Sequence, residues 1–428
     1  MIKILKSSEL SPDDILNRSE QEKNTEKTEK TVAEIIDKVR SDKDRALLEF
    51  TEEFDKVKLQ NIIVTEKEIA EAYKNTDSAF IEILKEAAEN IRFFHKKQVR
   101  EGFRSTEKDG IVLGQKITPI NKVGVYVPGG TASYPSTVLM NVIPAKIAGV
   151  KEIVMVSPPD KQGLISPAIL AAAKIAGVDL IFKVGGAQAI AALAYGTESI
   201  PKVDKIVGPG NIYVATAKRR VFGQVAIDMI AGPSEILVIA DETANPKCVA
   251  ADLLGQAEHD MLASAVLICT DLSFARRVKA EIVRQLTELL RRDIAERSIA
   301  NNGRIIVAGD ISEAIEISNR IAPEHLELCV ANPFDYLDKI ENAGSIFLGN
   351  NTPEALGDYF AGPNHTLPTS GTARFSSPLS VDDFIKKSSY ISYTKEALEK
   401  VKDRVVIFAE KEGLDAHARS VLTRFDKE

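Results

Sequence analysis

Histidines with carboxylates or glycines beside them are concentrated late in this chain. The chain has 5 histidines, and all but one of them, His259, His325, His365 and His417, lie beyond residue 258. Imidazole and carboxylate groups bind divalent metals, and imidazole also exchanges protons near neutral pH. These positions therefore predict a metal site together with an acid–base pair.

Gln256 and His259 could bind the same metal ion. They are three residues apart in a segment predicted to be helical, so both side chains point to one side of the helix. The pair alone is weak evidence, because glutamine is an uncommon zinc ligand and a polar helix end with a surface histidine explains it as well. Asp358 and His417 would add oxygen and nitrogen donors, and a set without thiolates suits zinc, with manganese as the less favoured ion.

Glu324 and His325 are candidates for acid–base catalysis. They follow Pro323 at the start of a predicted strand, where polar side chains often face a cleft. At a turn both could flank one substrate, and an imidazole with its ordinary pKa could accept a proton from it. A capping glutamate beside a structural histidine is an equally good interpretation of the two residues alone.

Residues 357–378 are predicted to form an active-site loop. Their glycines and prolines exclude regular secondary structure, and the same segment carries Asp358, Asn364, His365 and Arg374. A solvated connector is the alternative, since long ordered loops are usually but not always functional.

Three glycine-rich turns each follow a predicted strand and open a predicted helix, at residues 127–131, 184–188 and 207–211. Backbone N–H groups at such helix starts suit phosphate. None of the turns matches the Gly-x-Gly-x-x-Gly fingerprint, so a standard dinucleotide site is not demonstrated. Each turn is weak evidence alone, because tight strand-to-helix connections need glycine anyway.

Two series of short strands alternating with helices must position these residues. Such an alternation predicts parallel sheets with helical crossovers. The first series has strands at 123–127, 152–156, 180–184 and 205–207, with helices near 136–148, 165–176, 187–195 and 211–220. The second series has strands at 236–240, 265–270, 304–307, 326–330 and 345–348.

The two ends of the chain are predicted to be helical. A capping box at Thr65 and Glu68 opens one helix, and Asp77 or Ser78 caps a long helix that ends near Lys97. A C-terminal stretch carries a helix near 394–400 and a last helix with His417. This stretch is too small for a large core, so it could pack on another subunit.

Composition limits the classes of protein and partner. A chain of 428 residues exceeds what one hydrophobic core usually organises, so two or more domains are expected. A net charge of -7 argues against nucleic acid as a partner, and no apolar run reaches the ~20 residues that span a membrane. The chain starts without the apolar core of a secretion signal, so we expect a cytoplasmic protein.

The 3 cysteines are too few and too scattered for a disulfide framework or a thiolate zinc site, which fits a reducing compartment. Cys329, four residues after His325, could in principle be a thiol nucleophile in aldehyde oxidation. Packing inside a strand is the favoured interpretation of this cysteine.

Taken together, these motifs resemble the histidinol dehydrogenase family along nearly the whole chain. The resemblance rests on ordered segments at 185–194, 202–211, 231–235, 256–259, 322–326, 357–365 and 412–417. It implies an α/β fold with two incomplete Rossmann-like parallel-sheet domains and small N-terminal and C-terminal helical modules. The implied division is an N-terminal appendage at 1–22, a metal and catalytic domain at 23–122 and 234–379, a cofactor domain at 123–233, and a C-terminal module at 380–428.

The family oxidises L-histidinol to L-histidine through L-histidinal, as the last step of histidine biosynthesis, with two NAD and one zinc ion per site. The resemblance implies that the metal ligands are Gln256, His259, Asp358 and His417. These four residues would also contact the substrate, together with Ser234, His325, His365 and Glu412. It implies cofactor contacts from Tyr126, Gln188 and Asn211, and a homodimer in which Glu412 and His417 serve the site of the partner subunit.

Glu324 and His325 match the acid–base pair of the family. His325 would accept the hydroxyl proton as hydride leaves for NAD, and Glu324 would deprotonate the water that hydrates the aldehyde. Two other functions are alternatives. A metal-dependent hydrolase would leave the glycine-rich turns without a role, and a nucleotide- or metal-sensing oligomer would not need Glu324 and His325.

Overall fold

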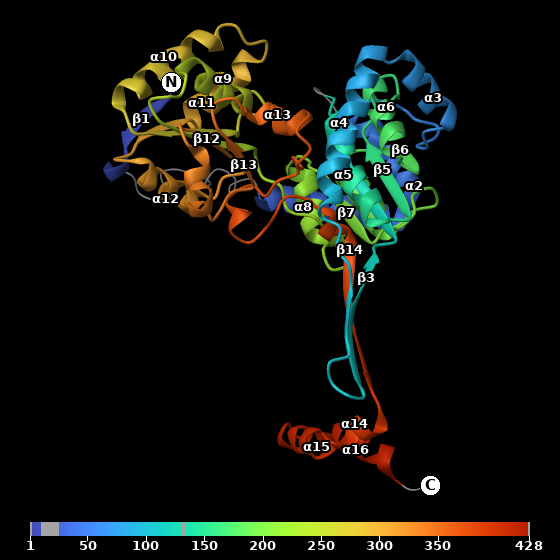
Figure 1. Ribbon diagram of the computed structural model, residues 1–428. Coiled ribbons are helices and arrows are strands. Elements are labelled where there is room, and N and C mark those ends of the chain that lie inside the picture. The colour runs from blue at the N-terminus through green and yellow to red at the C-terminus, as the bar shows by residue number, and fades with distance from the viewer. Residues whose placement is uncertain (1, 10–24, 130–132, 427–428) are drawn as a thin grey trace. The chain divides into compact units, whose positions relative to one another are not determined.

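The computed structural model describes residues 2–9, 25–129 and 133–426 (Figure 1). The chain divides into two compact units. Unit 1 comprises residues 1–98 and 120–384, and unit 2 comprises residues 99–119 and 385–428. Unit 1 contains two parallel sheets with helices on their faces, so the predicted α/β class is confirmed.

The first parallel sheet of unit 1 has five strands, in the spatial order β6-β5-β4-β7-β8. Counted along the chain this order is third, second, first, fourth and fifth, which is the order of Rossmann-like nucleotide-binding sheets. The strands are β4 (Lys122–Tyr126), β5 (Glu152–Ser157), β6 (Leu180–Lys183), β7 (Lys205–Val207) and β8 (Ala226–Ile227). The connecting helices are α5 (Pro135–Ala148), α6 (Pro167–Ala176), α7 (Gly186–Tyr195) and α8 (Ile212–Val221).

Three N-terminal helices also cover this five-stranded sheet: α2 (Thr25–Phe54), α3 (Glu66–Asn75) and α4 (Ser78–Lys96). They pack on α7, α6 and α5, respectively. The predicted caps are present, since Thr65 and Glu68 form a capping box and Asp77 accepts from the backbone of Phe80. The predicted grouping of residues 23–122 with the other sheet is therefore wrong for these helices, because their apolar faces join the two cores of the five-stranded sheet.

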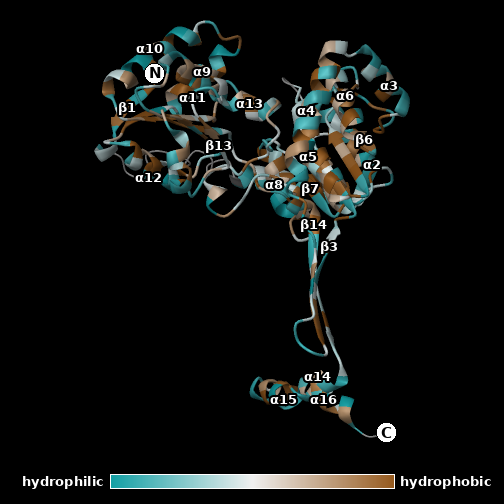
Figure 2. Cartoon of the chain, in the orientation of Figure 1, coloured by the Kyte–Doolittle hydropathy of each residue, from teal (hydrophilic) through white to brown (hydrophobic). Residues whose placement is uncertain are grey.

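The second parallel sheet has six strands, in the order β1-β11-β10-β9-β12-β13. Its helices α9, α10 and α11 cover one face, and α12 covers the other. The strands are β1 (Lys3–Lys6), β9 (Glu235–Ala240), β10 (Ser264–Cys269), β11 (Arg304–Val307), β12 (His325–Cys329) and β13 (Ser345–Leu348). The helices are α9 (Pro246–Ala257), α10 (Leu272–Leu286), α11 (Arg292–Asn301), α12 (Ile311–Ile321) and α13 (Glu354–Tyr359). In Figure 2 the most hydrophobic residues gather on the strands of both sheets and on the helix faces toward them.

The first strand corrects a second prediction. Residues 1–22 were expected to be an appendage, but β1 pairs in parallel with β11, and Ile2 is buried in the core of the six-stranded sheet. A strand of four residues with lysine at both ends carries almost no periodic signal. Residues 1 and 10–22 of the predicted appendage lie outside the described residues.

Unit 2 is a long antiparallel ribbon followed by short helices. Strand β14 (Ile385–Tyr393) pairs along its full length with β3 (Ile111–Pro119), which also pairs with β2 (Phe103–Ser105). The helices are α14 (Lys395–Glu399), α15 (Lys402–Lys411) and α16 (Asp415–Leu422). The predicted module at 380–428 includes these helices but lacks β3, because the partner strand lies in a distant part of the sequence.

The helices of unit 2 bury small side chains and expose large apolar ones. The buried residues of α14, α15 and α16 are Ala397, Ala409 and Ala418, whereas Ile407 and Phe408 are exposed.

In the part of the chain that the structure describes, no helix is both long and apolar enough to cross a membrane.

Candidate active site

The candidate catalytic side chains lie at the amino edge of the six-stranded sheet. Glu235 and His325 are the first residues of the neighbouring strands β9 and β12, and Glu324 directly precedes β12. Helices that follow parallel strands return toward this edge, and α9 and α13 are such helices. They carry Gln256 and Asp358. The fold thus gathers residues from four separate segments at one edge.

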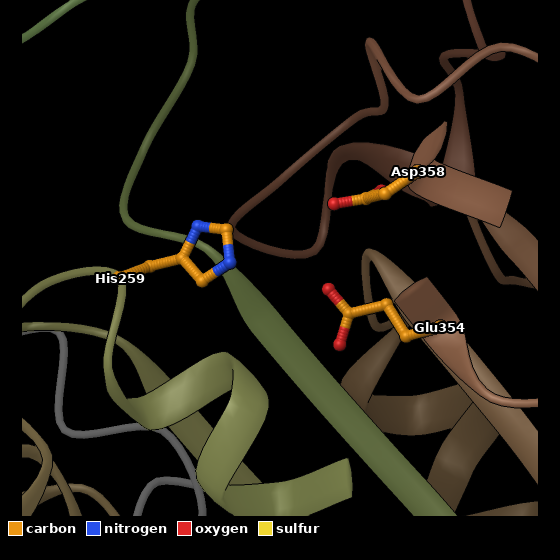
Figure 3. Close-up of side chains that lie close together, drawn as sticks. All are labelled: His259, Glu354 and Asp358. Carbon is orange, nitrogen blue, oxygen red and sulfur yellow. The ribbon is translucent and has the colours of Figure 1, made fainter. Parts of the chain in front are cut away.

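His259, Glu354 and Asp358 form a candidate metal site. One ligand atom from each of the three side chains lies within 4.8 Å of the other two. Figure 3 shows the imidazole and both carboxylates pointing toward a common space, with Glu354 and Asp358 coming from α13. Within the described ranges, no other group of three histidine, cysteine or carboxylate side chains meets this geometry. The structure therefore brings His259 and Asp358 together, as a shared ion requires.

Gln256 reaches the same site through Glu354. The Gln256 amide is oriented with its nitrogen, the hydrogen-bond donor, toward Glu354. This nitrogen donates to Glu354 Oε1 at 2.5 Å and to Oε2 at 2.9 Å. The amide oxygen of Gln256 is then the atom left to bind a cation. Sequence reasoning missed Glu354, although its position one helical turn before Asp358 places both carboxylates on one face of a helix.

The carboxyl groups at this edge are buried close to one another. Glu354 is 7% exposed. Burial raises the pKa of Glu354 well above its usual value, and the negative charges of Asp358 and Glu324 raise it further. Buried carboxylates without a positive neighbour are costly, so a divalent cation among them would offset their repulsion. The donor set of imidazole nitrogen with carboxylate and amide oxygens therefore fits zinc, and also manganese.

The His325 ring is held in one orientation. His325 is 4% exposed, and its Nδ1 lies 3.0 Å from the carbonyl oxygen of Glu235. A carbonyl only accepts, so Nδ1 carries the proton and Nε2 has the lone pair. Nε2 lies 3.8 Å from Asp358 Oδ1 and has no hydrogen-bond partner among the described residues. Because burial lowers the pKa of His325, its neutral ring is placed to accept a proton beside the metal site.

Glu324 lies on the other side of the same ring. Its Oε2 accepts from the backbone N–H of Glu235 at 2.8 Å and lies 3.7 Å from His325 Nδ1. Burial raises the pKa of Glu324 well above its usual value, and the negative charges of Glu235 and Asp358 act in the same direction. Glu324 is therefore a strong base whenever it is ionised. This backbone needs Gly344, because a Cβ there would lie 2.5 Å from the carbonyl oxygen of Glu324.

The loop that carries His365 is anchored to the five-stranded sheet. His365 Nδ1 lies 3.1 Å from the carbonyl oxygen of Asp358, and its Nε2 lies 3.5 Å from Thr137 Oγ1 on α5. The neighbouring Asn364 side chain donates to the carbonyl oxygen of Met140 at 2.6 Å. These buried contacts show that this part of the loop is not a solvated connector. His365 thus lies beside Asp358 as a candidate substrate contact.

The other predicted substrate contacts lie in different parts of the chain. Ser234 is half-buried directly before β9, and its carbonyl oxygen accepts from the N–H of Ser264 at 3.0 Å. Glu412 and His417 belong to unit 2, where both are exposed. Their assignment to a site stays a prediction.

The three predicted cofactor residues lie at the carboxyl edge of the five-stranded sheet. Tyr126 ends β4, Asn211 follows β7, and Gln188 lies in the first turn of α7. Strands β4 and β7 are neighbours where the strand order reverses, which is where ligands bind in sheets of this kind. Tyr126 is 4% exposed and its hydroxyl accepts from the N–H of Gly186 at 3.1 Å, and Gln188 is 2% exposed, whereas Asn211 is exposed. Residues 130 and 131 of the first glycine-rich turn lie outside the described residues.

A buried ion pair, missed by sequence reasoning, holds the third glycine-rich turn. Lys218 and Asp228 form this pair, and both side chains are at most 2% exposed. Lys218 Nζ donates to the carbonyl oxygen of Gly208 at 2.9 Å, and Asp228 Oδ2 accepts from the N–H of Gly208 at 2.8 Å. Gly208 has a φ of +109°, and a Cβ there would lie 2.1 Å from the carbonyl oxygen of Tyr126. Glycine is therefore required at this position.

Cys329 packs inside β12, in the core shared with α9, as expected. Burial raises the pKa of its thiol, and the negative charge of Glu327 raises it further. A thiol in this environment is not ionised near neutral pH, so Cys329 is unsuited to act as a nucleophile.

Comparison with known proteins gives a consistent result. The family model described as histidinol dehydrogenase matches residues 17–425. Histidinol dehydrogenase of Listeria monocytogenes serovar 1/2a is 58% identical over 418 residues, which cover 97% of this chain and 98% of the relative. Histidinol dehydrogenase of Clostridium acetobutylicum is 60% identical over 396 residues, or 92% of each chain.

A solved structure agrees with the sequence relatives. The crystal structure of histidinol dehydrogenase from Elizabethkingia anophelis matches with a TM-score of 0.89 and 44% identity, covering 92% of both chains. The family match and these identities extend over nearly the whole chain. The chain therefore belongs to the histidinol dehydrogenase family, a family of NAD-dependent dehydrogenases.

Proposed function

We propose that this protein oxidises L-histidinol to L-histidine through L-histidinal, with NAD as the hydride acceptor, in the last step of histidine biosynthesis. The main support for this proposal is the environment of His325. A buried neutral imidazole presents Nε2 beside Asp358 of the metal site, and Glu324 lies on its other side. One acceptor for the alcohol proton and one base for water are what the two oxidations need.

The metal in this proposal is one zinc ion per site, with manganese as a substitute. Its ligands are Gln256, His259, Asp358 and His417 of the partner subunit, and Glu354 orients the amide of Gln256. A bound divalent cation would orient the imidazole and amine of histidinol and stabilise negative charge on its oxygen.

In the first oxidation, His325 accepts the proton of the substrate hydroxyl at Nε2. The C–H bond of the same carbon breaks, its electron pair leaves as hydride to NAD, and a C=O bond forms. The hydrogen bond from Nδ1 to the carbonyl of Glu235 stabilises the imidazolium that results. His365 and Ser234 would contact the bound substrate.

In the second oxidation, ionised Glu324 accepts a proton from water as the water oxygen bonds to the aldehyde carbon. The C=O π bond breaks in the same step, and the former carbonyl oxygen takes the proton that His325 accepted in the first oxidation, which returns the imidazole to its neutral form. The hydrate then loses a hydroxyl proton to His325 and a hydride to a second NAD, which leaves a carboxylic acid. The hydrogen bond from the backbone of Glu235 holds Glu324 in place for this step. NAD would bind at the carboxyl edge of the five-stranded sheet, near Tyr126, Gln188 and Asn211.

Replacing Glu324 by glutamine tests these roles. Glu324→Gln should spare zinc and NAD binding but slow oxidation of L-histidinal by ~10²- to 10⁴-fold, because general base catalysis by one residue contributes about this much. The first turnover of L-histidinol should still release one NADH per site. Glu316→Gln, an exposed change on α12, is the matched control. Normal oxidation of L-histidinal by Glu324→Gln would reject the proposed role.

The proposal also includes a homodimer in which Glu412 and His417 complete the site of the partner subunit. His259→Ala and His417→Ala should each abolish most activity alone, because each removes a ligand. Subunits of the two variants, mixed and exchanged, should regain activity, since some sites then contain neither substitution. Verified heterodimers without recovered activity would show that each site uses one chain only.

A further inference from the structure

A second group of buried carboxyls lies behind the candidate metal site. Glu327 is 1% exposed and lies two residues after His325 on β12, so both side chains point to the same face of the sheet. Helix α9 covers that face, because Cys329 packs there with Val249 and Leu253. Strands buried on both faces of a parallel sheet are normally apolar throughout, so a carboxyl at this position calls for an explanation.

Glu327 connects the two helices that carry metal-site residues. Its Oε1 accepts from the backbone N–H of Glu354, the first residue of α13, at 2.8 Å. Its carboxyl is also hydrogen-bonded to the side chain of Asp252 on α9. Asp252 lies one helical turn before Gln256, and Glu354 lies one turn before Asp358. One buried side chain therefore ties β12 to both helices.

The contact between Glu327 and Asp252 requires a proton. Ionised carboxyl groups only accept hydrogen bonds, so one member of the pair must be protonated to donate to the other. Burial raises the pKa of both groups, and the negative charge of Asp252 raises that of Glu327 further. The pair thus brings one negative charge, rather than two, close to the metal site.

We propose that the hydrogen-bonded Glu327–Asp252 pair fixes the spacing of α9 and α13, and thereby sets the affinity of the site for its divalent cation. This inference rests on the proposed function, since it concerns the cation of that proposal. Glu327 and Asp252 are positioning residues, because they act through Gln256 and through the helix that carries Asp358. Substitution of a residue that holds metal ligands in place typically weakens metal binding by ~10- to 100-fold.

Two substitutions at residue 327 separate hydrogen bonding from burial. Glu327→Leu removes both hydrogen bonds at similar volume. Glu327→Gln keeps them, because its amide oxygen can accept from Glu354 and its amide nitrogen can donate to Asp252. Zinc affinity of the full-length protein is measured by competition with a chromophoric chelator near neutral pH. We expect Glu327→Leu to weaken zinc binding ~10- to 100-fold, and Glu327→Gln to stay within about threefold of the unsubstituted protein.

Ile305→Ala is the control for general destabilisation. Ile305 is fully buried in the same core but lies on β11, so its loss creates a cavity away from the metal-site helices. This variant should melt at a lower temperature with unchanged zinc affinity. If it loses as much affinity as Glu327→Leu, general destabilisation explains the result and the inference is overturned.

The remaining outcomes are also decisive. Equal zinc affinity of Glu327→Leu and the unsubstituted protein overturns this inference alone. If Glu327→Leu does not fold, Asp252→Ala, at a half-buried helix position, removes the other partner and is judged by the same affinities. An unsubstituted protein that binds no zinc overturns both this inference and the cation of the proposed function.

Discussion

The two parallel sheets of unit 1 share a strand order but place their candidate functional residues at opposite edges. Both run third, second, first, fourth and fifth along the chain, and β1 adds a sixth strand to one of them. The proposed cofactor residues lie at the carboxyl edge of the five-stranded sheet. The candidate catalytic residues lie at the amino edge of the six-stranded sheet. Strand order alone therefore does not determine which edge carries a site.

Helix direction gives a physical reason for the difference. At the carboxyl edge of a parallel sheet, helices begin, and their N-terminal N–H groups favour anions such as phosphate. At the amino edge helices end, and their C-terminal carbonyl groups favour cations. Gln256 lies in the last turn of α9, a helix of 12 residues, and His259 follows directly after the C-cap residue Glu258. One strand order thus offers an edge suited to a phosphate-bearing cofactor and an edge suited to a divalent cation.

The largest expected effect is at the amino edge. His325→Gln should lower kcat for L-histidinol oxidation by ~10²- to 10⁴-fold, because it removes the proton acceptor. Zinc and NAD binding should be retained, because His325 is neither a proposed metal ligand nor a proposed NAD contact. Steady-state kinetics and equilibrium binding check this. His95→Gln, at a buried histidine of α4, is the control and should keep its activity. A His325→Gln enzyme with nearly full kcat would show that the amino edge is not the catalytic edge.

A smaller effect is expected at the carboxyl edge, and the two sheets offer matched variants. Asn211 caps α8 in the five-stranded sheet, and Asn245 caps α9 in the six-stranded sheet, each through its side-chain oxygen. Asn211→Ala and Asn245→Ala should each lower the free energy of unfolding by ~1 kcal/mol. Only Asn211→Ala should also raise KM for NAD, by about tenfold.

Measurements of KM for NAD in both cap variants separate loss of a helix cap from loss of a cofactor contact. An equal rise in the two proteins would mean that loss of a cap, rather than loss of a cofactor contact, weakens NAD binding. No rise in Asn211→Ala would remove this residue from the proposed cofactor site.

The smallest effect concerns the stability of the five-stranded sheet. Asp55 lies just after α2, and burial raises its pKa to about 6. Its negative charge lies near Tyr126, whose pKa it raises. The folded state therefore binds this proton more tightly than the unfolded state, so Asp55 makes folding less favourable as the pH rises from about 4 to about 6.

Asp55→Asn should remove this pH-dependent cost. At pH 7 its free energy of unfolding should exceed that of the unsubstituted protein by ~1 kcal/mol after allowance for solvent screening, with no gain near pH 4. Urea unfolding at both pH values measures the difference. A gain of the same size at both pH values would contradict the assigned pKa.

The strands and caps of unit 1 could be predicted from the sequence because they depend on local patterns. Predicted strands such as 152–156 and 205–207 match β5 and β7 closely, and the capping box at Thr65 is present. Features that depend on distant pairing could not be predicted in the same way. The edge strand β1 and the ribbon of β3 with β14 join segments far apart in the chain.

The sequence predicts the residues of the site less completely than it predicts the strands. His259, Asp358 and His325 could be chosen by residue type, and the structure places them at one edge. The position of these residues at the amino edge can be recognised only once the pairing of the strands is known. Glu354 was missed although it lies one helical turn before Asp358. Glu327 was missed because a single buried carboxyl has no local signature, and its role appears only from its contact with the start of α13.

In the proposed function, one site carries out both oxidations. The most direct test uses metal-loaded protein with limiting L-histidinol and excess NAD, and measures the moles of NADH formed per mole of substrate by absorbance. We expect a ratio near two, with L-histidine as the product. A ratio near one would contradict it, because the reaction would then stop at the aldehyde and Glu324 would have no role in a second oxidation.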